Sequence, residues 1–162
     1  MLTSAQNQAL AAYITADPVL SAYPHTGDGA WEIAVKLNAP ATPDFIVWRT
    51  SVSQDEIMQN GFDWTRVNNL SVGSARCWEW LFDNTSSSIN PSKASVRAGI
   101  DEVWKGTAAD LAVRAAVYVH CKRKASVAEK LFATGTGTDA APALLVYEGA
   151  LAYTDVTAAM GW

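Results

Sequence analysis

The chain has 162 residues, a formal net charge of −4 and a charged fraction of 17%. This length predicts a single domain over residues 1–162 with a real hydrophobic core. The negative charge argues against a protein held to nucleic acid by overall positive charge, and no stretch has the roughly 20 apolar residues of a membrane span. The first residues lack the pattern of a signal peptide, so we expect a protein made in the cytoplasm.

The first forty residues predict helices separated by turns. Thr3 and Gln6 have capping-box spacing, in which each side chain bonds a backbone amide at a helix start, and this helix is expected to stop near Asp17. The proline after Asp17 is typical of the start of a second, short helix. A turn at 25–29 precedes a third helix, which we expect to end at Asn38 in a left-handed conformation.

The next segment predicts extended structure and then a short helix. The run Phe45–Trp48 has the β-branched and aromatic residues that are typical of a short strand or a buried extended segment. Ser53 and Glu56 repeat the capping-box spacing. A short helix is therefore expected at this point, and Gly61 is its expected end.

Two amphipathic helices are predicted on either side of a polar loop. Aromatic and apolar residues at helical spacing predict a helix over 72–82, and the serine-rich residues 84–88 are typical of an exposed loop. Asn90 precedes a proline and marks the start of the next helix. One face of that helix carries apolar side chains at helical spacing: Val96, Ile100, Val103 and Trp104.

The last third of the chain predicts a long helix and then extended structure. Thr107 opens the longest predicted helix, which runs from about 108 to 124, with a continuation as far as Phe132 left open. After a glycine-rich loop, 144–147 and 151–153 have alternation typical of strands. The fold is therefore predicted to be mainly α, a helical bundle with a short extended segment or small β-hairpin near the C-terminus.

Residue types that carry out catalysis or hold metals are few and poorly spaced. The histidines His25 and His120 and the cysteines Cys77 and Cys121 lack the paired spacing of a zinc site, and we expect two free, buried thiols. Neither a nucleophile elbow nor a phosphate-binding glycine motif with its lysine is present. We therefore expect no enzyme, no cofactor and no metal, with a hydrolase site that assembles only in space as an alternative.

Two stretches are candidates for binding a partner. One is the basic group on the longest predicted helix and at its end: Arg114, Lys122, Arg123 and Lys124. These cations either offset the negative pole of the helix or contact DNA phosphates or an acidic protein surface. The other is the aromatic C-terminal segment 143–162, with candidate contact residues Tyr147, Leu151, Tyr153 and Trp162. This segment either packs on its own core or docks into a neighbour, and removal of Gly149–Trp162 is expected to weaken assembly more than monomer folding.

A family resemblance is carried by four stretches that follow one another along the chain. They are Pro43–Val52, Ile89–Pro91, Arg123–Ala125 and Glu129–Gly137, and the most specific parts are Asp44–Ser53 and the last of the four. Together they resemble a group of structural proteins of tailed bacteriophages and prophages. None of the four is a catalytic motif. A helix-rich, mildly acidic virion protein of this length looks like a head–tail connector, or adaptor, protein.

The resemblance implies a homo-oligomeric ring of about twelve copies beneath the portal, in the neck of the virion, assembled in the host cytoplasm. It also implies contacts with portal and with tail or neck proteins, passage of DNA through the ring, and a terminal segment that grips the portal. A tail-completion or tail-assembly protein is an alternative within the same class. A small cytoplasmic helical regulator that binds nucleic acid through the basic residues is the alternative from another class. Nothing in the sequence indicates a membrane.

Overall fold

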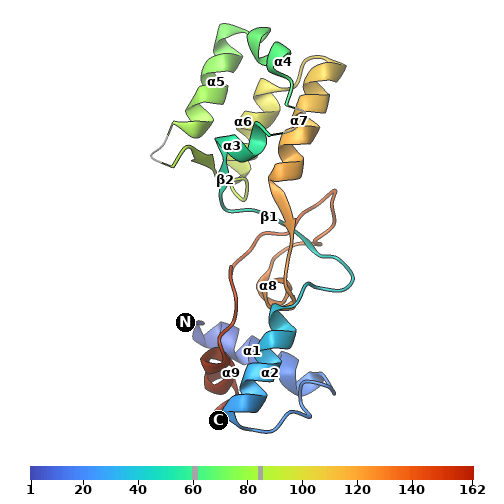
Figure 1. The fold of residues 1–162 in the computed structure, drawn as a ribbon, viewed down its shortest axis with the longest axis vertical. Coiled ribbons are helices and arrows are strands. Elements are labelled where there is room, and N and C mark those ends of the chain that lie inside the picture. Colours follow the sequence, from blue (N-terminus) through green and yellow to red (C-terminus); the bar gives the residue numbers. More distant parts are fainter. Residues whose placement is uncertain (60–61, 84–85) are drawn as a thin grey trace. The chain divides into compact units, whose positions relative to one another are not determined.

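The computed structural model describes residues 1–59, 62–83 and 86–162. About half of the chain is helical, and the described residues form nine helices and two small antiparallel sheets (Figure 1). The mainly α prediction is therefore confirmed. The predicted helix end at Gly61 and the beginning of the predicted loop 84–88 lie outside the described residues.

The chain divides into two compact units. Unit 1 combines the two ends of the chain, Met1–Val47 and Lys124–Trp162, and unit 2 is the intervening segment Trp48–Arg123. Each unit has its own cluster of buried hydrophobic side chains. The prediction of a single folding domain over 1–162 stays a prediction, because a division into units does not measure whether they unfold together.

Unit 1 is built mainly from helices at the two ends of the chain, drawn in blue and red in Figure 1. The helices are α1 (Ser4–Ala16), α2 (Gly27–Asn38), α8 (Val127–Phe132) and α9 (Tyr153–Met160). Helix α9 packs against both α1 and α2, although more than a hundred residues separate them in the sequence. The largest fully buried side chains of this core are Leu10, Ile14, Ile33, Leu37 and Val156.

The start of α1 follows the predicted capping box. The Gln6 amide N–H donates to Thr3 Oγ1 at 3.2 Å, and the Thr3 N–H donates to Gln6 Oε1 at 2.9 Å. The expected second helix after Asp17 does not form. Instead, Asp17 Oδ1 accepts the N–H groups of Val19 and Leu20 at 2.8 and 3.0 Å and holds a turn. A short aspartate satisfies the same donors in a turn as in a helix, so the local signal was ambiguous.

The side chain of Asn38, the last residue of α2, binds a segment far along the chain. The expected left-handed end is not found, because Ala39 follows in an extended conformation. The Asn38 side chain donates to the Leu151 carbonyl at 2.9 Å, and its Oδ1 accepts the Leu151 N–H at 2.8 Å. This pair of bonds attaches the segment before α9 to the end of α2, so Asn38 is a connection between the two ends of the chain.

The region near the C-terminus is an extended segment followed by a helix. Ala143 and Leu144 form isolated bridges with Val47 and Thr134, and residues 145–152 have no regular structure. Helix α9 then begins at Tyr153. Of the two predicted forms, the described residues 143–162 contain the extended segment and not the hairpin between 144–147 and 151–153.

Unit 2 contains five helices and one of the small sheets within its described residues. Helix α5 packs on α6, and α7 contacts both α3 and α4. Val52 and Ile89 face each other in the sheet, which is antiparallel. The elements are β2 (Val52–Ser53), α3 (Gln54–Ile57), α4 (Trp64–Asn68), α5 (Val72–Phe82), β3 (Ser88–Ile89), α6 (Ala94–Val103) and α7 (Ala108–His120).

The longest predicted helix is divided into three elements. Helix α7 ends at His120, strand β4 covers Lys122–Lys124, and α8 starts at Val127. Strand β4 pairs with β1 (Ile46–Trp48), and next to this pair the Arg49 N–H donates to the Cys121 carbonyl at 2.9 Å. Backbone pairing with a distant segment therefore overrides a local sequence pattern that is compatible with a continuous helix.

Aromatic rings fill the core of unit 2 around Trp104. Trp104 is fully buried, and its ring makes edge contacts with Trp78 and Phe62 at centroid distances of 5.5 and 6.5 Å. Ile100 and Val103 lie in the same buried cluster, as the predicted apolar stripe requires. The helix starts later than expected, since Asn90 forms a turn with Ser92 and α6 begins at Ala94.

Candidate functional site

The outer face of α7 has no charged side chain along its centre. Residues at helical spacing on this face are exposed: Ala108, Leu111, Ala112, Ala115 and Val119. Leu111 is 42% exposed and Val119 is 71% exposed. The opposite face is buried through Asp110, Val113 and Val117. An exposed helix face made only of aliphatic side chains is typical of a surface that packs against another protein.

The outer face of α5 combines large apolar side chains with unlike charges. Trp80 is 82% exposed and Val72 is 71% exposed, whereas Trp78 and Phe82 are buried on the other side of the helix. A hollow of about 550 Å³ lies beside Trp80. Among the described residues, those that line it are Arg76, Cys77, Glu79 and Trp80.

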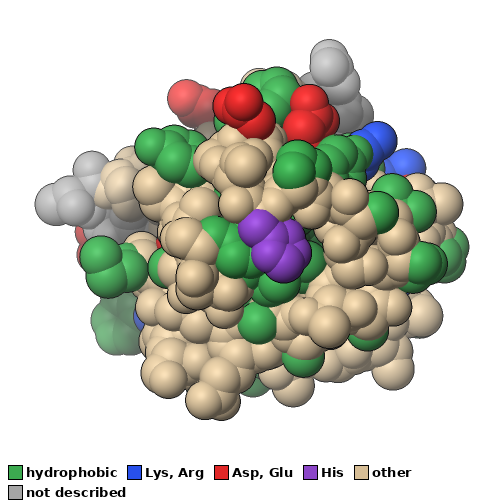
Figure 2. Space-filling view, turned by 90° about the horizontal axis from the view of Figure 1, so that it is seen from below, with side chains coloured by type: hydrophobic (Ala, Val, Ile, Leu, Met, Phe, Trp, Pro, Cys, Tyr) green, Lys and Arg blue, Asp and Glu red, His purple; other side chains and the backbone are tan. Residues whose placement is uncertain are grey.

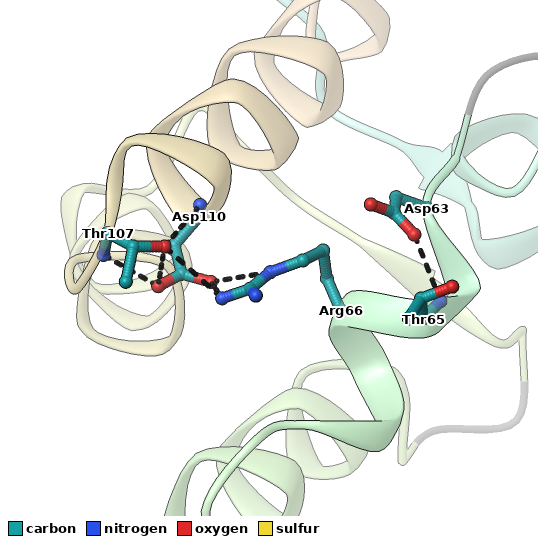
Figure 3. Close-up of polar contacts among 5 residues, drawn as sticks. All are labelled: Asp63, Thr65, Arg66, Thr107 and Asp110. Carbon is teal, nitrogen blue, oxygen red and sulfur yellow. Dashed lines mark hydrogen bonds and ion pairs between the residues drawn. The ribbon is translucent and has the colours of Figure 1, made fainter.

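A polar cluster joins α4 to the start of α7 (Figure 3). Arg66 Nε donates to Asp110 Oδ1 at 3.2 Å, and its Nη2 donates to Thr107 Oγ1 at 3.2 Å. Asp110 also completes a capping box, since its Oδ2 accepts the Thr107 N–H at 2.7 Å. The hydrogen bonds from Arg66, and then those from Thr107, lower the pKa of Asp110 to about 2. Every polar group in the cluster serves another part of the fold, so we assign it a structural role.

We expect Asp110→Asn to make the stability of unit 2 less dependent on pH. The depressed pKa means that ionised Asp110 stabilises the fold above about pH 4, and that this contribution is lost as the pH falls towards about 2. In urea titrations the variant should be less stable than the parent at pH 7, with a difference that shrinks towards pH 2. Glu102→Gln, which removes an exposed ion pair with Lys105, is the control and should change little. A difference that stayed constant with pH would contradict this account.

Three of the predicted basic residues, Arg114, Lys122 and Lys124, have identified partners within their own units. Arg114 Nη1 lies 3.5 Å from Asp101 Oδ1, and Lys122 Nζ lies 5.9 Å from the centre of the Trp48 ring. In unit 1, Lys124 Nζ forms an ion pair with Asp44 Oδ2 at 2.7 Å. Arg123 is likewise engaged with a partner. Arg114, Lys122 and Arg123 belong to unit 2 and Lys124 belongs to unit 1, so the structure does not present them as one group of a single unit.

The predicted contact residues of the C-terminal segment differ in what they expose. Leu151 is 3% exposed and belongs to the core of unit 1, which leaves it little surface for a partner. Tyr147 packs against the same core, and Trp162 stacks on His25 with ring centres 4.4 Å apart. Only Tyr153, which is 50% exposed, has a large free surface.

The aromatic C-terminal segment is therefore attached to other parts of unit 1 by contacts of its backbone and side chains. Glu129 Oε1 accepts the Gly149 N–H at 3.2 Å, which adds a second backbone attachment to the one at Asn38. On the face drawn in Figure 2, hydrophobic side chains surround a histidine, and the charged side chains lie towards the edge. The contacts correspond to the packing alternative for this segment and not to a free docking arm.

The thiols and carboxylates of the described residues are dispersed. No group of three or more His, Cys, Asp and Glu side chains that could hold a metal occurs among these residues. The prediction of two buried thiols is wrong for Cys77, which is exposed because it lies on the side of α5 away from the buried Trp78. Cys121 is buried, and burial raises the pKa of its thiol to about 12. No helix in the described part of the chain is long and apolar enough to cross a bilayer.

The exposed residues of α5 and α7 were not among the predicted contact residues. Sequence reasoning used the apolar stripe of 72–82 to find the buried side, and Trp80 lies two positions from Trp78 and so about 200° away around the helix. A helical projection would have placed Trp80 on the side of α5 opposite Trp78, and Val119 on an uncharged side of α7. Neither signal indicates exposure until the buried side is known.

No protein-family model, no curated protein and no solved structure matches this chain. The surfaces favour recognition of another protein, because both exposed helix faces present apolar side chains to water.

Proposed function

We propose that this chain is a non-enzymatic structural protein of a tailed-phage virion, a head–tail connector that forms a ring under the portal. The observation that carries the proposal is the uncharged outer face of α7. In this proposal the helices of each copy form a bundle, and α7 lies against a helix of the next copy. The sequence resemblance supplies the virion neck as the location.

The α7 face is well suited to packing between copies. Its alanines, such as Ala112 and Ala115, let a second helix approach closely, and Leu111 and Val119 supply larger side chains that fill the space between the helices. Burying aliphatic groups requires no desolvation of charges, so such a face gains free energy simply by leaving water. A ring needs a heterologous contact, in which this face meets a different surface of the neighbour.

The C-terminal segment has a different part in this proposal from the one that the resemblance implies. A terminal arm that grips the portal must be free to leave its own unit, whereas Leu151 and Val156 are buried in unit 1. We therefore assign portal and neighbour contacts to exposed helix faces. A nucleic-acid-binding regulator has less support, because Arg114 and Lys124 each form an ion pair with a carboxylate of their own unit.

The proposal is tested by mixing the purified chain with the portal of the phage that encodes it. We expect a ring on the portal in negative-stain electron micrographs and a matching mass by light scattering. Val119→Lys should abolish the ring and leave the melting midpoint unchanged, because Val119 is 71% exposed. Val19→Lys is the matched control, since Val19 is 61% exposed in a turn of unit 1, and it should still assemble. Failure of the parent chain to bind portal or form a ring would overturn the proposal.

A further inference from the structure

A second exposed helix face, on α5, is separate from the face used in the proposed function. Val72, Arg76 and Trp80 follow one another at intervals of four residues and therefore share one side of the helix. Trp80 is 82% exposed and Val72 is 71% exposed. Fully burying a tryptophan removes about 150–250 Å² from water, so Trp80 alone offers a large gain to whatever covers it.

The charges beside Trp80 indicate what covers this face. Arg76 and Glu79 carry opposite charges and both line the hollow next to Trp80. Neither takes part in an ion pair among the described residues of unit 2. In a two-fold contact, residue i of one copy meets residue j of the other, and j meets i. If two α5 helices cross antiparallel near Cys77, Arg76 of each copy meets Glu79 of the other, which forms two ion pairs.

The same antiparallel crossing also brings the Trp80 side chain of each copy against the other copy. Trp80 of each copy then lies beside Arg76 of the other, in the arrangement of a cation–π contact. The hollow of about 550 Å³ leaves room for the Trp80 ring of the other copy. Its lining residues Arg76, Cys77 and Glu79 lie on the side that the other copy approaches. A parallel crossing would instead place like charges together, Arg76 on Arg76 and Glu79 on Glu79. Charge complementarity therefore selects the antiparallel pair.

We propose that the outer face of α5 binds the same face of a second copy of this chain, as an antiparallel two-fold pair. The pairing goes beyond the proposed function, because it uses a different helix and describes the chain before any portal is present. One helix from each copy covers less surface than the roughly 800 Å² per partner of a standard stable interface. The dimer is therefore expected to be weak and to form at high protein concentration.

Charge reversal provides the decisive test, by sedimentation velocity over a range of concentrations. The parent chain should dimerise, and Arg76→Glu or Glu79→Arg alone should each weaken dimerisation at least about tenfold, since each places two pairs of like charges together. An equimolar mixture of the two variants should restore the dimer, because each chain then carries the charge that the other lacks. Both side chains are on the exposed side of α5, so we expect unchanged melting midpoints.

Cross-linking through Cys77 provides an independent test of how the two α5 helices are placed. It lies beside the expected two-fold axis and is exposed, whereas Cys121 is buried. A short bis-maleimide should therefore link two copies through Cys77, Cys77→Ser should prevent the link, and either single charge reversal should slow it. A parent chain that stays monomeric at every concentration would overturn the proposal. The proposal would also be overturned if either single charge reversal left dimerisation unchanged, or if the equimolar mixture of the two variants did not dimerise. Loss of ring formation on portal would leave this pair intact, so the two proposals fail separately.

Discussion

Replacing Trp104 with alanine is expected to destabilise unit 2 by about 3–5 kcal/mol, the range for deleting a fully buried large aromatic side chain. The Trp104 side chain is fully buried and contacts the rings of Trp78 and Phe62. Alanine would leave a cavity among these rings, and the surrounding helices can relax only partly to fill it. Urea unfolding followed by far-ultraviolet circular dichroism measures the loss.

Trp104→Phe is the matched variant, and its expected effect is much smaller. The Trp104 indole nitrogen is buried and has no hydrogen-bond partner in the described structure. Phenylalanine keeps an aromatic ring in place and removes this unsatisfied donor, whose burial costs about 1–3 kcal/mol. Trp80→Ala is the surface control, because Trp80 is 82% exposed, and it should leave the unfolding of the monomer nearly unchanged. An unchanged midpoint for Trp104→Ala would show that the indole is not part of the core.

Removing residues 149–162 is expected to unfold unit 1, in contrast to the sequence-based expectation that assembly would suffer more than folding. The deletion removes Leu151 and Val156 from the core and takes away the partner of the Asn38 side chain. Helices α1 and α2 would then expose their apolar faces to water. Circular dichroism of the shortened chain should show a loss of helix well beyond the eight residues of α9 itself.

A single substitution gives the graded form of this test. Leu151→Ala should cost about 2–5 kcal/mol, because Leu151 is 3% exposed. Tyr153→Ala serves as the control in the same segment, since Tyr153 is 50% exposed, and it should cost far less. If the shortened chain kept its helical signal and melted like the parent, the C-terminal segment would be an appended arm, as the resemblance implies.

Helix starts that have a capping box could be determined from the sequence alone, because the box joins residues three positions apart. The boxes at Thr3 and Ser53 form as predicted, and Thr107 also caps the helix that it was expected to open. A fourth box, Ser126 with Glu129, has the same spacing and opens α8. The sequence prediction missed this helix start, because it favoured one long helix that could continue to Phe132. The apolar stripe that ends at Trp104 was also readable, since its members lie within nine residues.

Residues far apart in sequence decided the rest. Helix α7 stops at His120 because the following backbone pairs with β1, more than seventy residues earlier. The C-terminal segment belongs to a core because Asn38 and Glu129 bind its backbone, and an aromatic, uncharged segment suits a core and an interface equally well. Trp80 is a surface residue only because its helix buries Trp78. Local hydrogen bonds are encoded by local spacing, whereas the side of a helix that meets water depends on which other segments cover it.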